Sequence, residues 1–443
     1  MTFSNRVRFD LRTSGKWPRR AHEAAEARIV VDYAGDAATR QAVQLHLRPF
    51  DKVRSSYYRH HSHKYPKIRS IEDIPDRLVR TYEGSISTDA ADPQRGDMWA
   101  IMQSDRPPFL VLMSSLDAQI LHSSEHVVCD GTFAYRPGDF SFSQLYILFA
   151  FVNNNMAEST PVCCALMPNK KHESYEALFR LIAARLTQQF GTVRALATAF
   201  FHFDFKSAPA SAVKAVFPQA VVKGCTFHFA KALNSNLQDK GLLPAYRKSE
   251  THKFNLPQYD CIKVWVRRLV ALALLPAHHV RPVYERLLST APVTNNAAVD
   301  ASLRSFNAYF KKQWMSSDTM VQRLSHFDHE GPRTNNHAEG YNNSLSSKFD
   351  ERQRPTLSRF LVTLQQVHHA QQTKIRRYLS DAQPQTPRNA HYTRNDRLIL
   401  NSKRSYAHLL HTLSPHTPDY FGIIDRETLR YLDWVQKYLG THP

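Results

Sequence analysis

Glycine is scarce in this sequence, with 13 in 443 residues, and no two glycines have the spacing of a dinucleotide-binding G-x-G-x-x-G loop or a Walker A loop. Enzymes that hold a nucleotide in such loops are therefore excluded. Cysteine is also scarce, and an odd set of five in a chain of this length predicts reduced thiols rather than a disulfide framework. The longest apolar run, residues 145–152, is much shorter than the roughly 18 residues of a membrane-spanning helix, so we expect no membrane span.

Acidic residues are outnumbered by basic ones: 39 Asp and Glu stand against 58 Lys and Arg, which gives a net charge of +19. This excess predicts a polyanion as partner. The amino terminus has no apolar stretch of the kind that a secretory signal needs, so we expect the protein to stay inside the cell.

Basic and aromatic side chains alternate near the end of a basic amino-terminal segment, residues 1–70. Two interpretations are open: the cations bind phosphates while tyrosines stack on bases, or the stretch is a solvated linker. The candidate DNA-binding residues are Arg54, Arg59, Lys64, Lys67 and Arg69.

The hydrophobic pattern from residue 126 onward predicts an α/β core. Strands are expected at 126–135, 144–152, 160–167, 196–203 and 219–224, with helices at 172–190, 207–216 and 226–238. Three strands in succession, extended by strands reached through helices, are the chain order of a ribonuclease-H-like core, a mixed sheet flanked by helices.

The rest of the chain is assigned around this core. We predict a lead-in region at 71–125, the first part of the core at 126–239, and an all-helical insertion at 240–330 that lacks strand patterning. Residues 331–379 would complete the core with an amphipathic helix. A Pro-, Asn- and Gln-rich linker at 380–397 and a small helical tail would fill 380–443.

Three carboxylates fall where a ribonuclease-H-like topology gathers its chemistry: Asp130 on the first strand, Asp204 at the end of the fourth, and Glu339 on a later helix. Hard oxygen ligands suit Mg²⁺, and two such ions can activate a water or a 3′-hydroxyl and stabilise the leaving oxygen. Each acid also has a structural interpretation. Asp130-Gly131 fits a hairpin turn, Asp204 can bond to a turn backbone, and Asn336 with Glu339 has capping-box spacing.

Five short motifs in this order resemble the transposase domain of the Mutator-like element (MULE) family, over roughly residues 70–350. They are D-G-T-F at 130–133, D-F at 204–205, F-P-Q-A at 217–220, C-T-F-H at 225–228 and T-N-N-H-A-E-G-Y-N-N at 334–343.

The resemblance implies a DDE-type transposase that cleaves DNA and transfers strands, with a helical insertion between its second and third acids. Asp130, Asp204 and Glu339 would be the catalytic residues and would bind two Mg²⁺ or Mn²⁺ ions. The partners would be double-stranded DNA, at element ends and target, and further copies of the chain, because two ends must be paired. The resemblance also implies nuclear localisation. A domesticated, non-catalytic DNA-binding or regulatory protein is the alternative, and a nuclease without joining activity is a third.

The sequence departs from the family in two places. Lys206 stands where relatives often carry an acid, and no zinc-finger array of cysteines occurs in the amino-terminal region. Cys225 and His228 have zinc-like spacing, but only His252 and Cys261 are near enough in sequence to complete a site. We therefore expect a packed structural pair rather than zinc.

Overall fold

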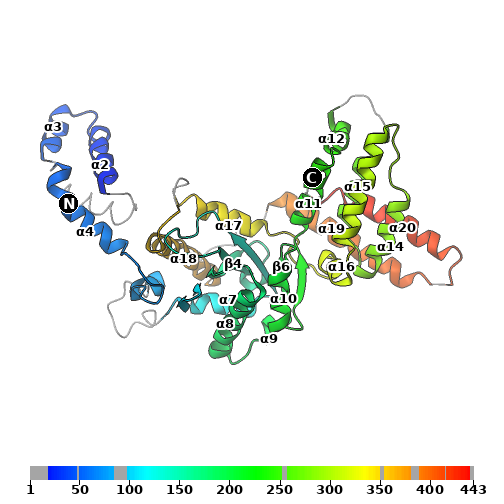
Figure 1. Ribbon diagram of the computed structural model, residues 1–443, viewed down its shortest axis with the longest axis horizontal. Helices are drawn as coiled ribbons and strands as arrows, with labels where there is room; N and C mark the ends of the chain where they lie inside the picture. The colour runs from blue at the N-terminus through cyan, green and yellow to red at the C-terminus, as the bar shows by residue number, and fades with distance from the viewer. Residues whose placement is uncertain are drawn as a thin grey trace.

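The chain divides into three parts along its longest axis (Figure 1). In this computed structural model the residues described are 18–46, 49–83, 97–251, 257–349, 354–380, 389–414 and 416–439. Three amino-terminal helices stand at one end, a sheet with its covering helices lies in the middle, and a cluster of helices forms the other end. None of the described helices combines the length and apolar character that a bilayer crossing requires.

The middle part is built on a seven-stranded sheet with the order β1-β2-β5-β4-β3-β6-β7. β3, β4 and β5 form an antiparallel meander, β6 pairs parallel with β3, and β7 pairs parallel with β6. The strands are β1 Ala100–Asp105, β2 Pro108–Leu112, β3 His126–Thr132, β4 Gln144–Phe151, β5 Ser159–Met167, β6 Phe200–Phe203 and β7 Val221–Gly224. The predicted α/β class, a mixed sheet flanked by helices, is confirmed.

Helices cover both faces of this sheet (Figure 1). Every residue of β4 is buried, and successive side chains point to opposite faces. Leu148 packs with Leu178 of α8, whereas Ile147 packs with Phe360 of α18. The first face carries α7 Ser115–Ser123, α8 His172–Phe190 and α10 Ser207–Val216, and the second carries α17 Asn336–Ser346 and α18 Leu357–Leu379.

The described residues within 226–324 and 390–439 pack into one helical lobe around a second core. Its helices are α11 Thr226–Asp239, α12 Leu243–Thr251, α13 Pro257–Ala271, α14 Ala277–Ser289, α15 Ala297–Trp314, α16 Asp318–Leu324, α19 Ala390–Thr412 and α20 Tyr420–Val435. Side-chain caps at Asn296 and Ser317 fix where α15 and α16 begin. As predicted, the described part of 240–330 contains helices and no strand.

Four sequence predictions are wrong in detail. Residues 50–64 are not a linker but α4, which packs with α2 Pro18–Asp32, and α2 also packs with α3 Ala37–His46. The predicted linker at 380–397 is helical from Ala390, while 381–388 lie outside the described residues. The tail is not small, because α19 and α20 supply part of the helical-lobe core. The fourth strand begins only at Phe200, after a short helix, α9 Arg194–Ala197.

The lead-in region also contains elements that the hydrophobic pattern did not predict. β1 and β2 form a hairpin, and β2 continues the sheet beyond β5. α5, Asp76–Val79, packs against α18 on the second face. The sheet is therefore two strands wider than expected.

Candidate active site

Asp130 lies inside β3, between two neighbouring strands. It pairs with Ile147 of β4, and Gly131 pairs with Tyr146, so the strand runs through both residues. The hairpin-turn interpretation of Asp130-Gly131 is therefore wrong. A β-strand offers a rigid support for a side chain whose position matters for chemistry.

The Asp130 carboxyl has a pKa raised to about 6, mainly by burial, and the nearby carboxylates of Asp204 and Glu339 raise it further. Asp204 and Glu339 are therefore each close enough to Asp130 to act on its charge. Asn342 Nδ2 donates a hydrogen bond to Asp130 Oδ2 at 2.8 Å, and Tyr135 in turn donates to Asn342 Oδ1 at 2.7 Å. This chain of hydrogen bonds holds one oxygen of Asp130 in place, and the Gly131 backbone N–H also bonds to the carboxylate.

Asp204 directly follows β6, at the same sheet edge. β6 runs parallel to β3, with Val128 opposite His202. The same register places Asp204 beside Asp130, toward the carboxyl ends of both strands. Lys206 Nζ lies 2.6 Å from Asp204 Oδ2, and the Lys206 backbone N–H donates to Asp204 Oδ1 at 3.1 Å. Asp204 thus bonds to the backbone of the turn, as its structural interpretation predicts. Its other oxygen is paired with the Lys206 ammonium, which would compete with a metal ion for that oxygen.

Glu339 lies in the first turn of α17, which packs over β3. The residue that caps this helix is Asn335, and its side chain makes no capping bond. The capping box between Asn336 and Glu339 is therefore not formed. The Glu339 carboxylate is half-buried and adds to the negative field at Asp130.

Cys225 ties the start of α11 to the start of α17. Its thiol donates to Asn335 Oδ1 at 3.1 Å, and the Asn335 N–H donates back to the sulfur at 3.4 Å. The Thr226 N–H and hydroxyl both donate to the Arg333 carbonyl, at 2.8 and 2.9 Å. These bonds set the position from which the Glu339 helix starts. Burial raises the pKa of the Cys225 thiol to about 11, so the sulfur is a neutral hydrogen-bonding group here.

His228 lies one turn further along α11, near two of the acids. Burial lowers its pKa, whereas the Asp204 and Glu339 carboxylates raise it. Its Nδ1 is buried and has no hydrogen-bond partner among the described residues. Of the further zinc candidates, His252 lies outside the described residues and Cys261 is an exposed free thiol on α13.

Residues 126–232 match the family model of the MULE transposase domain. The chain carries a MULE transposase domain. The match runs from β3 into α11, so it includes Asp130, Asp204, Cys225 and His228 and ends before Glu339. The resemblance seen in the sequence is confirmed. Among curated proteins, none matches the chain.

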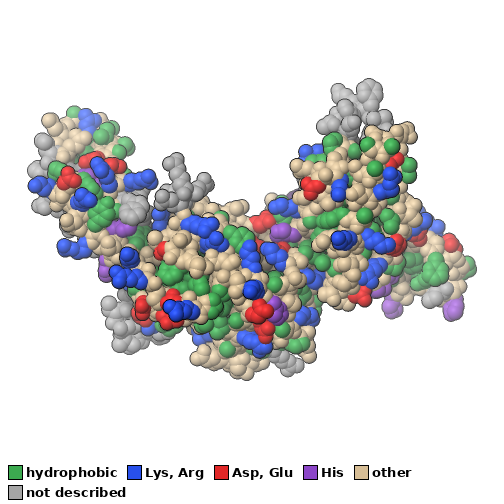
Figure 2. Space-filling model, in the orientation of Figure 1, with side chains coloured by type: hydrophobic (Ala, Val, Ile, Leu, Met, Phe, Trp, Pro, Cys, Tyr) green, Lys and Arg blue, Asp and Glu red, His purple; other side chains and the backbone are tan. Residues whose placement is uncertain are grey.

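The basic amino-terminal candidates lie apart from the MULE domain, on and just after α4, Phe50–Lys64 (Figures 1 and 2). Arg54, Arg59, Lys67 and Arg69 are exposed. Lys64 is half-buried, and burial lowers its pKa. The structure therefore leaves four of the five side chains open to a partner and does not bring them to the acids.

Two polar groups of the site were missed by the sequence reasoning. Asn342 stands three residues after Glu339 on the same helix, which is the spacing of neighbours on one helix face, so the helical period was the available signal. Arg323 donates to the backbone carbonyls of Asp204 and Lys206 at 3.2 and 3.1 Å. It comes from α16 in the helical lobe, 119 residues away along the chain, and no sequence signal links it to this turn.

Proposed function

We propose that this protein is a DDE-type MULE transposase, in which Asp130, Asp204 and Glu339 cleave DNA and transfer strands at element ends with the help of Mg²⁺ or Mn²⁺. The observation that carries the proposal is the placement of Asp130 in β3, Asp204 after the parallel strand β6 and Glu339 in the helix that packs over β3, so that Asp204 and Glu339 both act on Asp130. The first two acids lie in the segment that matches the MULE domain. The strand order β5-β4-β3-β6-β7, with β6 and β7 parallel to β3, supports a ribonuclease-H-like core.

The donor set fits two hard divalent ions. Carboxylate oxygens are the ligands that Mg²⁺ prefers, and cations would favour the ionised form of Asp130, whose pKa is raised by burial and, to a smaller extent, by the neighbouring carboxylates. No three His, Cys, Asp or Glu side chains of the described residues converge on one point that could hold a metal ion. Asp204 is turned to Lys206 and Asp130 to Asn342, so their side chains must rotate toward each other to share a ligand.

Each residue has a defined task in this proposal. The bound ions supply Lewis acidity, which activates a water or 3′-hydroxyl and stabilises the leaving oxygen. Asn342 orients Asp130, and the Cys225–Asn335 bonds hold the helix that carries Glu339. When Lys206 releases Asp204, its ammonium becomes available to a DNA phosphate.

Double-stranded DNA, at element ends and at the target, is the proposed partner, and the net charge of +19 supports it. The exposed side of α4 adds a surface of suitable size, because the major groove of DNA admits one α-helix. On α4, Arg54 and Arg59 flank the small exposed Ser55, and Arg54 stacks over Tyr58. We propose a homo-oligomer, because two DNA ends must be paired, and a nuclear location, which is what the family resemblance implies.

A second function is a non-catalytic DNA-binding or regulatory protein derived from a transposase. One observation favours it: the Lys206 ammonium occupies a carboxylate oxygen that a metal would need. The two functions differ in metal dependence and share DNA binding.

Cleavage of labelled DNA carrying the terminal sequences that flank the element, in Mn²⁺ and in EDTA, separates them. We expect nicking at the ends in Mn²⁺ alone, and a loss of at least about 100-fold in Glu339→Gln, because a required metal ligand is removed. Glu173→Gln is the matched control, since Glu173 is also a first-turn glutamate and is exposed on α8. Nicking that survives in Glu339→Gln contradicts the catalytic assignment. DNA binding without cutting by the unmodified protein supports the second function.

A further inference from the structure

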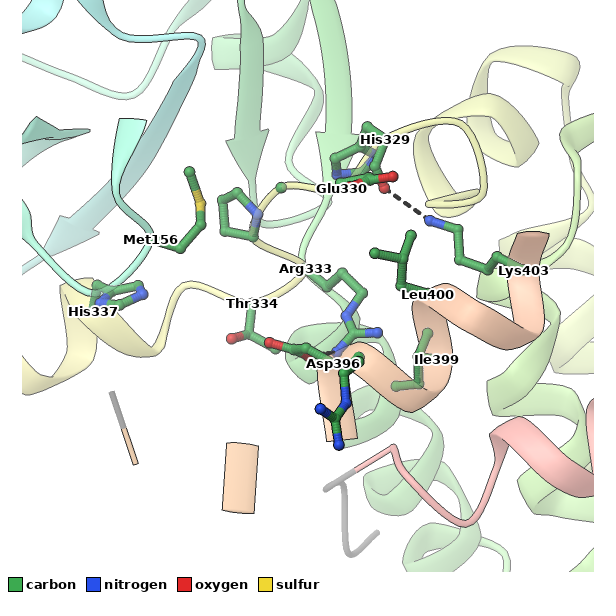
Figure 3. A pocket seen from close by; sticks show the side chains of 13 residues that line it. Met156, His329, Glu330, Arg333, Thr334, His337, Asp396, Ile399, Leu400 and Lys403 are labelled. Carbon is green, nitrogen blue, oxygen red and sulfur yellow. Dashed lines mark hydrogen bonds and ion pairs between the residues drawn. The ribbon is translucent and has the colours of Figure 1, made fainter. Parts of the chain in front are cut away.

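A cavity of about 220 Å³ lies between the segment that leads into α17 and the side of α19 (Figure 3). Residues 329–334 and His337 line one side, and residues 396–403 of α19 line the other. Met156, between β4 and β5, completes the wall. The catalytic proposal assigns no task to this cavity.

The cavity lies next to the candidate active site. His337 precedes Glu339 by two residues in the first turn of α17, and the Arg333 carbonyl is the group to which Thr226 of α11 is bonded. One stretch of chain, residues 331–339, therefore forms part of both sites.

The walls combine apolar surface with cations. Met156 and Leu400 extend toward the cavity from opposite sides (Figure 3), and Pro332 and Ile399 add further apolar surface. Such a pair of surfaces suits a flat ring between them.

Three cationic residues line the cavity, against two acidic ones. Arg333 is paired with Asp396, and Lys403 donates to the His326 and His329 carbonyls at 2.8 Å each. Arg397 is exposed and forms no ion pair with any described residue. One guanidinium at the rim is therefore available for an anion.

Size narrows the ligand further. A cavity of about 220 Å³ is far larger than one bound water needs. That is room for one heterocyclic ring system, whereas a DNA duplex is far too wide. A ring with an attached anion is the chemistry of a single nucleotide.

We propose that this cavity receives one unpaired nucleotide of the DNA end, with its base between Met156 and Leu400 and its phosphate at Arg397. This inference rests on the proposed function, because DNA supplies the nucleotide. Extruding a base is easiest where the strand is already unpaired, so an end with an overhang is the preferred ligand. α19 thereby becomes part of the DNA-binding surface beside the acids.

The test is binding of the full chain, in EDTA, to two duplexes of the flanking terminal sequence, one blunt and one with three unpaired nucleotides that include 2-aminopurine. Fluorescence anisotropy gives the affinities, and 2-aminopurine emission reports the environment of the unpaired base. We expect the overhang to bind about tenfold tighter than the blunt duplex, a ratio consistent with stacking of one base.

Two variants test the cavity in different ways, one by reducing its volume and one by removing the cation at its rim. Leu400→Trp fills it, and Arg397→Ala removes an exposed side chain that folding does not need. Both are expected to reduce the overhang-to-blunt ratio to about 1. Arg394→Ala is the matched control, because Arg394 is also exposed on α19 but does not line the cavity; it is expected to keep the ratio.

Each other outcome overturns the inference. An unmodified protein without overhang preference, or a preference that persists in both variants, shows that the unpaired nucleotide binds elsewhere. Displacement of the 2-aminopurine signal by micromolar free dAMP shows a site for free nucleotides. Loss of all DNA binding defeats this inference and the proposed function together. Absence of metal-dependent cleavage with the preference intact defeats only the proposed catalysis.

Discussion

Two clusters of ionisable side chains are built on the same two strands, β3 and β6, and they behave in opposite ways. Asp130 and Asp204 belong to the carboxylate cluster at one end, with Glu339. The other cluster contains His126 of β3 and His202 of β6, together with His326 and His329 from the loop before α17.

The histidine cluster is closed. His126 Nδ1 lies 3.2 Å from His202 Nε2, His326 Nδ1 lies 3.4 Å from His329 Nε2, and His326 Nε2 contacts the Gly224 carbonyl at 2.6 Å. All four rings are buried. Burial lowers the pKa of His126 to about 4 and that of His326 to about 3, so the rings are neutral at pH 7. They tie the end of α16 and the loop after it to the sheet.

The carboxylate cluster is open. Its members are half-buried, carry like charges and are held apart by Asn342 and Lys206. Crowded ionisable groups are tolerated in a fold either when they are neutral and bonded to one another, or when a ligand of opposite charge completes them. The comparison assigns a structural task to the histidines and a binding task to the acids.

The largest expected effect is a loss of stability when a side chain is added at Gly331, which packs against the His126 ring of the closed cluster. A Cβ atom at this position would lie 2.0 Å from His126 Cε1, and a buried ring cannot move aside cheaply. Gly331→Ala is expected to lower the free energy of unfolding by about 2 to 3 kcal/mol, as overpacking does. Urea denaturation measures this. Gly340→Ala is the control, because no atom lies within 4 Å of its added Cβ and alanine favours a helix. Equal stability of the two variants would contradict the packing of this loop on the sheet.

The neutral state of the histidines makes a prediction about pH. A pKa held below its usual value of 6.5 means that the unfolded chain binds protons first, so stability is full above pH 6.5 and is lost as the pH falls toward 4. In His126→Gln one fewer proton should be taken up on unfolding. The slope of the unfolding free energy against pH should therefore fall by at most about 1.4 kcal/mol per pH unit. Unfolding free energies measured from pH 4.5 to 7.5 give the slope. Exposed His416→Gln serves as control, and an unchanged slope in His126→Gln would show that this ring does not titrate on unfolding.

The comparison also shows what could be predicted from the sequence. The strands and helices of 126–238 could be predicted because their hydrophobic residues recur with a clear period. The three acids could be selected because each falls on an element where a ribonuclease-H-like topology carries a carboxylate. The lobe of α2 to α4 buries only a small cluster that includes Ala25, Val53 and Tyr57, so its polar helices leave little hydrophobic period to detect.

Contacts between distant segments were beyond such reading. The histidine cluster joins positions up to 203 residues apart, and neutral buried imidazoles have no pattern of their own in sequence. The Cys225–Asn335 bonds span 110 residues. The C-x-x-H spacing in the sequence is compatible with zinc binding. The fold shows instead that the Cys225 sulfur forms hydrogen bonds with Asn335, just before the helix that carries Glu339.

The smallest expected effect concerns Lys206, whose ammonium already occupies one carboxylate oxygen of the open cluster. Its ammonium competes with any cation for Asp204, so Lys206→Ala should tighten Mn²⁺ binding about two- to fivefold, the range of a partly exposed ion pair. Electron paramagnetic resonance of free Mn²⁺ measures this without DNA or turnover. Lys52→Ala removes an exposed cation of α4, which lies apart from the MULE domain (Figure 1), and should leave the affinity unchanged. Weaker Mn²⁺ binding in Lys206→Ala would mean that the lysine organises Asp204 for the metal instead of competing with it, and the acids would then form a site prepared in advance rather than one that each ion must open.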